Sequence, residues 1–186
     1  MDFGIAMATA ADSWKIVERA EALGFSHAWF YDTQMLSADC FVAMGAAAVK
    51  TSRIRLGTGV LVPSNRIAPV TANALASLNQ LAPGRIDFGI GTGFTARRAM
   101  GLNAMRLADM TRYIEVVLAL LAKETVEVDF TKWFFPKCNV DDSVPCRIFR
   151  GNSGQRLRGN PDPDTGVGGL SRVDNPWGIK ALTINT

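Results

Sequence analysis

Short apolar segments alternate with helical segments along the first two-thirds of this chain, and this alternation restricts the fold more than any other feature. Strands that are joined by helices in this way pair in parallel and are buried on both faces of the sheet. We therefore expect an α/β fold. The expected strands are 3–8, 27–33, 53–62 and 85–91, and the expected helices are 12–24, 38–51, 67–81 and 106–124.

The expected helices carry recognisable ends and one clear apolar face. Asp12 or Ser13 is suited to cap the first helix, and Gly24 to end it. Pro69 is tolerated in the first turn of the helix at 67–81. The last helix has the strongest amphipathic pattern. Its expected apolar face consists of Leu107, Met110, Ile114, Val117, Leu118 and Leu121.

The character of the sequence changes after Glu124. The segment "TVEVDF" predicts one more short strand, and no sustained period follows it. Between Gly151 and Gly178 about a quarter of the residues are glycine, well above the average of ~7%. We expect an ordered barrel portion at 1–130 and an irregular or aberrant tail at 131–186.

Composition excludes several classes of protein. The net charge of +3 is small, and no run of basic residues suggests a nucleic-acid surface. No apolar stretch reaches the ~18 residues of a membrane span, and the "MDFGIAMA" start lacks the basic region of a signal peptide. The 3 cysteines show no CxxC spacing, which argues against a disulfide scaffold or a metal site. We expect a soluble, cytoplasmic protein.

Two of the expected strands are interrupted by glycine, in "RIRLGTGVLVP" (53–63) and in "RIDFGIGTGFT" (85–95). Glycine weakens a strand interior, so it usually marks a bulge or a place where another group approaches the backbone. In parallel βα folds, ligands bind at the carboxyl ends of the strands. The candidates there are Asp32, Thr33, Gln34, Thr58, Gly59, Val60, Gly91, Thr92, Gly93 and Phe94.

The position of each titratable residue along its strand indicates whether it lies near the expected site. His27, the only histidine, and Asp87 begin their strands, so they lie at the opposite end from the expected site. For Asp87 an ion pair with a nearby arginine is the better interpretation. Asp32 ends an apolar strand, where a carboxylate is costly to bury alone. It is expected to cap a helix, to meet solvent or to meet a ligand.

The segment "GTGFTA" (91–96) also matches the dinucleotide-binding pattern G-x-G-x-x-A. That pattern expects an acidic residue about 20 positions later, at the end of the next strand. The candidate here, Asp109, falls inside an expected helix. A doubly wound nucleotide-binding module therefore stays an alternative that lacks its acidic partner.

Four segments together resemble the luciferase-like monooxygenase family: "HAWFYDTQ", "IRLGTGVLVP", "RIAPVTANALASLNQLAPGRIDFGIGTG" and "MTRYIEVVLALLAKE". The resemblance runs to about residue 128. It implies a TIM (β/α)8-barrel, which normally needs ~250 residues, so this chain would hold only four to five βα units. The tail after them departs from the family, and the chain is expected to be a truncated form.

The resemblance also implies a chemistry. The family binds reduced flavin mononucleotide (FMN) or a deazaflavin coenzyme and oxidises or reduces a small organic substrate. By comparison, the Gly59–Val60 bond, preceded by Thr58, would be a non-prolyl cis peptide that backs the cofactor ring. Asp32 and Thr33 would lie near the polar edge of the ring, and Gly91, Thr92 and Gly93 would contact the cofactor or the substrate.

The resemblance leaves the catalytic residue open. Many relatives have a histidine where this chain has Thr33, so no proton donor is named, and the catalytic residues stay unknown. The same family includes flavin and deazaflavin enzymes, and the choice between them stays open. The alternative function is an inactive half-barrel that binds a partner chain, and a homo-oligomer is possible in either case.

Overall fold

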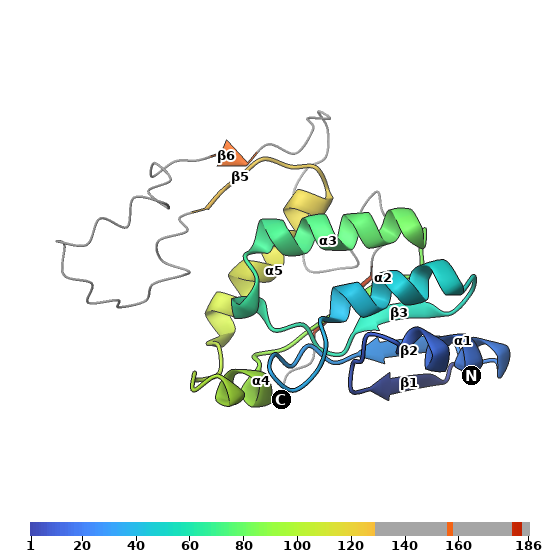
Figure 1. The fold of residues 1–186 in the computed structure, drawn as a ribbon. Helices are drawn as coiled ribbons and strands as arrows, with labels where there is room; N and C mark the ends of the chain where they lie inside the picture. The colour runs from blue at the N-terminus through green and yellow to red at the C-terminus, as the bar shows by residue number, and fades with distance from the viewer. Residues whose placement is uncertain (129–155, 158–179, 184–186) are drawn as a thin grey trace.

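A parallel five-stranded sheet forms the centre of the protein. The structure is a computed structural model that describes residues 1–128, 156–157 and 180–183. The strand order is β1-β2-β3-β4-β7, and all neighbours run in parallel. Figure 1 shows β1, β2 and β3 side by side. The strands are β1 (Gly4–Met7), β2 (His27–Phe30), β3 (Arg55–Thr58), β4 (Ile86–Ile90) and β7 (Lys180–Thr183). The expected α/β class is confirmed.

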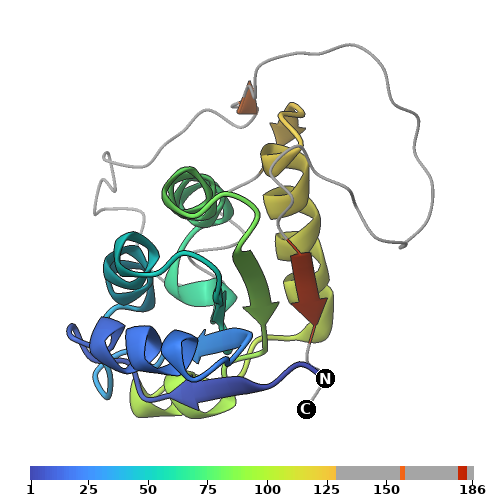
Figure 2. The same ribbon diagram turned by 90° about the vertical axis from the view of Figure 1, so that its right-hand side faces the viewer.

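Helices follow the strands in turn and cover one face of the curved sheet (Figure 2). The long helices are α1 (Trp14–Ala22), α2 (Cys40–Lys50), α3 (Ala68–Leu81) and α5 (Leu107–Leu121). Consecutive long helices pack against each other, α1 on α2, α2 on α3 and α3 on α5. Two short elements lie in the loops at the carboxyl end of the sheet, the 3₁₀ turn η1 (Pro63–Asn65) and α4 (Phe94–Ala99).

The hydrophobic core lies between the sheet and these helices. Phe30, Leu56 and Phe88 point into it from neighbouring strands, and all three are fully buried. On α5 the buried residues are Met110, Tyr113, Val116, Val117 and Leu121. The expected apolar face was therefore wrong at its start, because Leu107 is 58% exposed and Tyr113 packs inward instead.

The start of α1 differs in detail from the expectation, whereas its end agrees with it. Ser13 stands at the N-cap of α1, but its hydroxyl accepts a hydrogen bond from the N–H of Ala10, 2.9 Å away, and caps no helical amide. Asp12 forms an exposed ion pair with Lys15 instead. Gly24 follows α1 with a φ of +88°, so a glycine does end this helix as expected.

The fifth strand of the sheet comes from a segment for which the sequence predicts no strand. Lys180–Thr183 pairs with β4, from Asp87 to Ile90. The strand expected in "TVEVDF" exists as β5 (Val126–Glu127), but it pairs antiparallel with β6 (Arg156–Leu157) in a separate small sheet. The division at residue 130 stays a prediction, since most of 131–186 lies outside the described residues.

The topology decides between the two sheet architectures considered. Strands β1 to β4 stand side by side in chain order, which is the arrangement of a βα barrel. A doubly wound sheet reverses its strand order, so this alternative is excluded. Within the described residues β1 and β7 are the two edges, and the barrel is incomplete. Among those residues, no helix has the length and apolar character needed to span a bilayer.

Candidate functional site

β3 leaves the regular ladder at its carboxyl end and bulges. Gly57 pairs with Asp87, and the next bridge joins Leu61 to Ile90. Four steps along β3 therefore correspond to three along β4, which defines a bulge with one extra residue. Within the bulge the Gly59–Val60 peptide is cis, as the family resemblance implies.

The side chain of Thr58 replaces the missing ladder bonds. Its hydroxyl donates to the carbonyl of Gly89 at 2.7 Å and accepts from the N–H of the same residue at 3.1 Å. Thr58 is fully buried. The O–H donor and one acceptor position of this hydroxyl are thus used inside the sheet, and the residue is buried as a whole, backbone included.

The glycines of β3 and β4 make room for an indole and for the bulge. A Cβ on Gly57 would lie 2.4 Å from Cζ3 of Trp29, and one on Gly59 would lie 2.9 Å from Cβ of Trp29. A Cβ on Gly89 would lie 2.2 Å from the carbonyl oxygen of Thr58, and one on Gly91 would lie 2.7 Å from Cγ2 of Val60. Part of what approaches the glycine backbone is therefore the protein's own tryptophan.

Asp32 is 2% exposed and has several partners within the chain. Nη1 of Arg66 lies 2.9 Å from both of its carboxylate oxygens. Oδ1 also accepts from Nε2 of Gln34 at 2.6 Å, and Oδ2 accepts from the N–H of Val62 at 3.1 Å. Asp32 therefore caps no helix and faces no solvent, and its main partner is an arginine that the sequence analysis does not single out.

Arg66 connects Asp32 to the start of α2. Its Nη2 donates to Oδ2 of Asp39 at 2.5 Å, while Oδ1 of Asp39 caps α2 by accepting from the N–H groups of Phe41 and Val42. Burial alone would lower the pKa of Arg66, but the Asp32 carboxylate beside it more than offsets this and raises the pKa. The guanidinium stays charged, and both of its Nη atoms are bound to carboxylates.

A cavity of about 400 Å³ opens beside this pair. Its polar lining includes Gln34, Ser37, Asn65 and Arg66, so it lies between the loops that follow β2 and β3. Cys40 is fully buried nearby, and burial followed by the charge of Asp32 raises the pKa of its thiol. The thiol is therefore protonated at neutral pH and is not an activated nucleophile.

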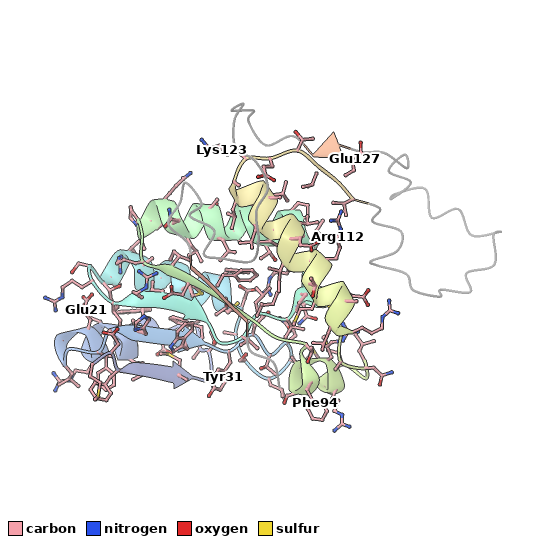
Figure 3. All side chains as sticks on the ribbon, turned by 180° about the vertical axis from the view of Figure 1, so that it is seen from behind. Glu21, Tyr31, Phe94, Arg112, Lys123 and Glu127 are labelled. Carbon is pink, nitrogen blue, oxygen red and sulfur yellow. The ribbon has the colours of Figure 1, made fainter. Side chains whose placement is uncertain are left out.

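The other expected site residues lie at the same end of the sheet. Thr33 follows Asp32 and is half-buried, and the segment from Gly91 to Gly93 follows β4. Val62 lies against Gly93, whose missing Cβ would be 2.4 Å from Cγ1 of that valine. Figure 3 shows Tyr31 and Phe94 at this end of the molecule and Glu21 at the other.

His27 and Asp87 occupy the amino end of the sheet, as expected from the sequence. Asp87 forms an ion pair with Arg55, with an Nη2–Oδ1 distance of 2.6 Å, which confirms the structural interpretation. The His27 ring stacks on Trp29, with 5.9 Å between ring centroids. Among the described residues, no three or more His, Cys, Asp or Glu side chains gather as metal ligands.

Two residues of this region are missed by sequence reasoning, Arg66 and Trp29. Arg66 stands in a loop without periodicity, 34 residues from the carboxylate it binds. Trp29 belongs to a strand whose residues alternate between two covered faces, so its side of the sheet is not readable from hydrophobicity. Only the clustering of glycines across neighbouring strands hinted that a large group lies there.

Comparison with known proteins gives the same assignment as the topology. The profile of the luciferase-like monooxygenase family matches residues 4–155. An F420-dependent glucose-6-phosphate dehydrogenase of Beutenbergia cavernae is 38% identical over 127 residues, which is 62% of this chain and 38% of that protein. The chain thus spans about two-fifths of this relative's length.

Two solved structures share the fold. The coenzyme F420-dependent tetrahydromethanopterin reductase of Methanopyrus kandleri matches with a TM-score of 0.57 and 26% identity, over 66% of this chain and 40% of that one. The oxygenating constituent of 3,6-diketocamphane monooxygenase from Pseudomonas putida, solved with FMN, has a TM-score of 0.61 and 18% identity, over 69% and 41%.

The sequential parallel strands, the outer helices and the bulged third strand define part of a βα-barrel. The chain belongs to the luciferase-like monooxygenase family. Its relatives include enzymes that depend on the deazaflavin F420 and a monooxygenase that binds FMN.

Proposed function

We propose that this chain forms the ring-binding part of a flavin- or deazaflavin-dependent oxidoreductase that acts on a small organic substrate. The observation that carries the proposal is the bulge of β3, which presents the Gly59–Val60 backbone at the carboxyl end of the sheet. Ligands of parallel βα folds bind at this end. The F420-dependent relatives favour a deazaflavin as the first choice.

The residues of the bulge suit a flat, largely apolar ring. Val60 is half-buried, and Gly91 beside it has no side chain that could stand above this surface. Thr33 and Thr92 are half-buried polar residues at its margin. Backbone and small side chains allow a tricyclic ring to approach closely.

A bound flavin or deazaflavin supplies the hydride or electron chemistry, and the protein supplies binding, orientation and exclusion of water. In this proposal Gly59 and Val60 support one face of the ring. Thr33, Gly91, Thr92 and Gly93 contact its edge or the substrate, while Asp32 and Thr58 hold the backbone beneath. No side chain of this chain is assigned as proton donor.

Thermal unfolding of the intact chain with reduced F420, and separately with reduced FMN, tests the proposal. A ligand that binds only the folded state stabilises it by about 2.7 kcal/mol at one hundred times its Kd. Val60→Arg should remove this shift, because it places a long charged side chain on the ring surface. Val49→Arg is the matched control, since Val49 is exposed on α2, away from the site.

The choice of cofactor follows from which ligand produces the shift. A shift with F420 alone assigns the chain to the deazaflavin group, and a shift with FMN alone assigns it to the flavin group. The proposal fails if neither ligand shifts the melting of a folded chain, or if Val49→Arg abolishes the shift as completely as Val60→Arg.

A partner-dependent half-barrel is the second candidate. It is favoured by the open edge of β1 among the described residues and by the fraction of its relatives that the chain spans. In that case the chain should bind cofactor only together with a second polypeptide, or as an assembly of copies. Sedimentation velocity with and without cofactor distinguishes this candidate from a chain that binds cofactor as a monomer.

A further inference from the structure

The bulge of β3 is attached to the end of β2 at two points. The N–H of Gly59 donates to the carbonyl of Phe30 at 2.8 Å. Three residues later, the N–H of Val62 donates to Oδ2 of Asp32 at 3.1 Å. The Gly59–Val60 peptide lies between these attachments. On the other side, backbone hydrogen bonds of Leu61 with Gly89 and Gly91 hold the same segment to β4. The Asp32 carboxylate therefore contributes the side-chain attachment of the bulge to β2.

Asp32 is held in turn by Arg66. The guanidinium contacts both carboxylate oxygens from one side, and its second Nη reaches Asp39 at the start of α2. The aromatic ring of Phe41, 4.9 Å from the guanidinium carbon, covers the cation. A buried carboxylate without its cation is strongly unfavourable. Removal of Arg66 would therefore turn Asp32 towards solvent and release the amide of Val62.

We propose that Arg66 is a positioning residue of the cofactor surface, which acts through Asp32 to hold the bulge of β3 in its ring-facing arrangement. This inference rests on the proposed function for its effect on cofactor binding. Arg66 itself points to two carboxylates, so its action on the ring is indirect. The fork of arginine is required, because a lysine ammonium is a single point charge and cannot hold both carboxylates in the same way.

The chain contains a matched control for this proposal. Arg55 binds Asp87 at the other end of the sheet through Nε and Nη2, at 2.9 and 2.6 Å. The two arginine side chains are similarly shielded, at 13% exposed for Arg66 and 20% for Arg55. The two aspartates are nearly fully buried. Arg55→Met should therefore lower stability as Arg66→Met does, without touching the bulge.

The experiment compares wild type, Arg66→Met, Arg66→Lys and Arg55→Met as intact chains. Two quantities are measured, the Kd for reduced F420 and for reduced FMN, and the amide hydrogen-exchange rate of Val62. In Arg66→Met the Kd should rise by about tenfold or more, because the surface that supports the ring is no longer pre-organised. The Val62 amide should exchange at least about tenfold faster, because its acceptor is lost.

The control and the conservative variant complete the test. Arg55→Met should keep both quantities within about twofold of wild type at an equal loss of melting temperature. Arg66→Lys should give an intermediate increase in the cofactor Kd and in the exchange rate of Val62. If Arg66→Met does not fold, the Arg66→Lys variant provides the test of the proposal. The proposal is overturned if Val62 exchanges at the wild-type rate in the Arg66 variants, or if Arg55→Met weakens cofactor binding equally.

Failure of the proposed function has a different signature. If wild type binds neither cofactor, the ring-binding role is lost, but the exchange rate of Val62 still reports whether Arg66 holds the bulge. If Val62 then exchanges faster in the Arg66 variants but not in Arg55→Met, Arg66 holds the bulge in place but has no demonstrated effect on cofactor binding. Unchanged exchange would reject both parts.

Discussion

The two ends of the sheet use the same arginine–aspartate chemistry for different purposes. At the amino end Arg55 pairs with Asp87, within the part of β3 and β4 that is in regular register. At the carboxyl end Arg66 pairs with Asp32, and Asp32 also binds a backbone amide of a strand that has left its ladder. The two buried ion pairs thus differ in one respect, since only the pair at the carboxyl end also holds irregular backbone.

At the amino end, charged side chains bind the backbone of the loops. Glu21 accepts hydrogen bonds from three successive backbone N–H groups, those of Ser52, Arg53 and Ile54. Arg85 donates to the backbone carbonyls of Ala48, Thr51 and Ile54. These contacts fix the turn between α2 and β3. The charged side chains of the amino end thus stabilise a turn, whereas those of the carboxyl end hold the bulged segment of β3.

The largest loss of stability is expected from Gly89→Ala, which introduces a clash with the backbone at the carboxyl end of the sheet. The new Cβ would lie 2.2 Å from the carbonyl oxygen of Thr58, and a main-chain oxygen cannot move aside as a side chain can. We expect a loss of about 3 kcal/mol or more in the free energy of unfolding, measured by urea denaturation.

Gly45→Ala is the control for this substitution. Gly45 lies in α2, and the nearest atom to its missing Cβ is 3.9 Å away. Because alanine is the better helix former, this variant should gain about 0.5–1 kcal/mol. If Gly89→Ala were as stable as wild type, the close contact between the bulge and β4 would be wrong.

A smaller loss is expected from Thr58→Val, which keeps the shape of the side chain and removes its hydroxyl. The variant leaves the buried N–H of Gly89 without the acceptor that it has at 3.1 Å. We expect a loss of about 2 kcal/mol in urea denaturation. Thr58→Ser retains the hydroxyl and should recover most of that loss, whereas equal losses in the two variants would assign the effect to packing.

The smallest effect is expected at the amino end, from Glu21→Gln. Burial opposes ionisation of this carboxyl, but the backbone N–H groups of Ile54, Arg53 and Ser52 outweigh it and lower the pKa of Glu21. A lowered folded-state pKa stabilises the protein above the unfolded-state value of about 4.3. This stabilisation is lost as the pH falls through the folded-state pKa.

The substitution should therefore cost less than about 1 kcal/mol at pH 7, since the group is largely solvent-screened. The difference from wild type in urea denaturation should shrink as the pH is lowered below about 4. Glu18→Gln, an exposed glutamate on the same helix, provides the control and should change little at either pH. If the difference in unfolding free energy between Glu21→Gln and wild type grew as the pH was lowered, the lowered pKa of Glu21 would be contradicted.

Local patterns in the sequence predicted what depends on local structure. The helix expected at 67–81 is observed at Ala68–Leu81, and the glycine-interrupted strand at 53–62 contains the bulge. The position of the cis peptide came from the family resemblance, since no propensity of Gly59 or Val60 indicates it. For such features a relative carries information that composition does not.

Contacts between distant segments were not predictable in the same way. The partner of Asp32 is Arg66, and nothing in the loop around Arg66 distinguishes it from a solvated arginine. The strand Lys180–Thr183 is four residues long, too short for alternation to stand out from its surroundings. The face occupied by Trp29 is decided by which side the helices cover, which is a property of the assembled sheet.

The extra residue in β3 also changes how this segment tolerates evolution by insertion and deletion. Residues two apart share a face of a strand, so without the bulge Leu61 would lie on the same side as Gly57, towards the indole of Trp29. With it, Leu61 joins the buried core beside Ile90. Removal of one residue between them would restore three steps against three and leave Leu61 opposite Ile90. A single gap here would therefore abolish the bulge at Gly59 and Val60, while every following side chain of the strand kept its present face.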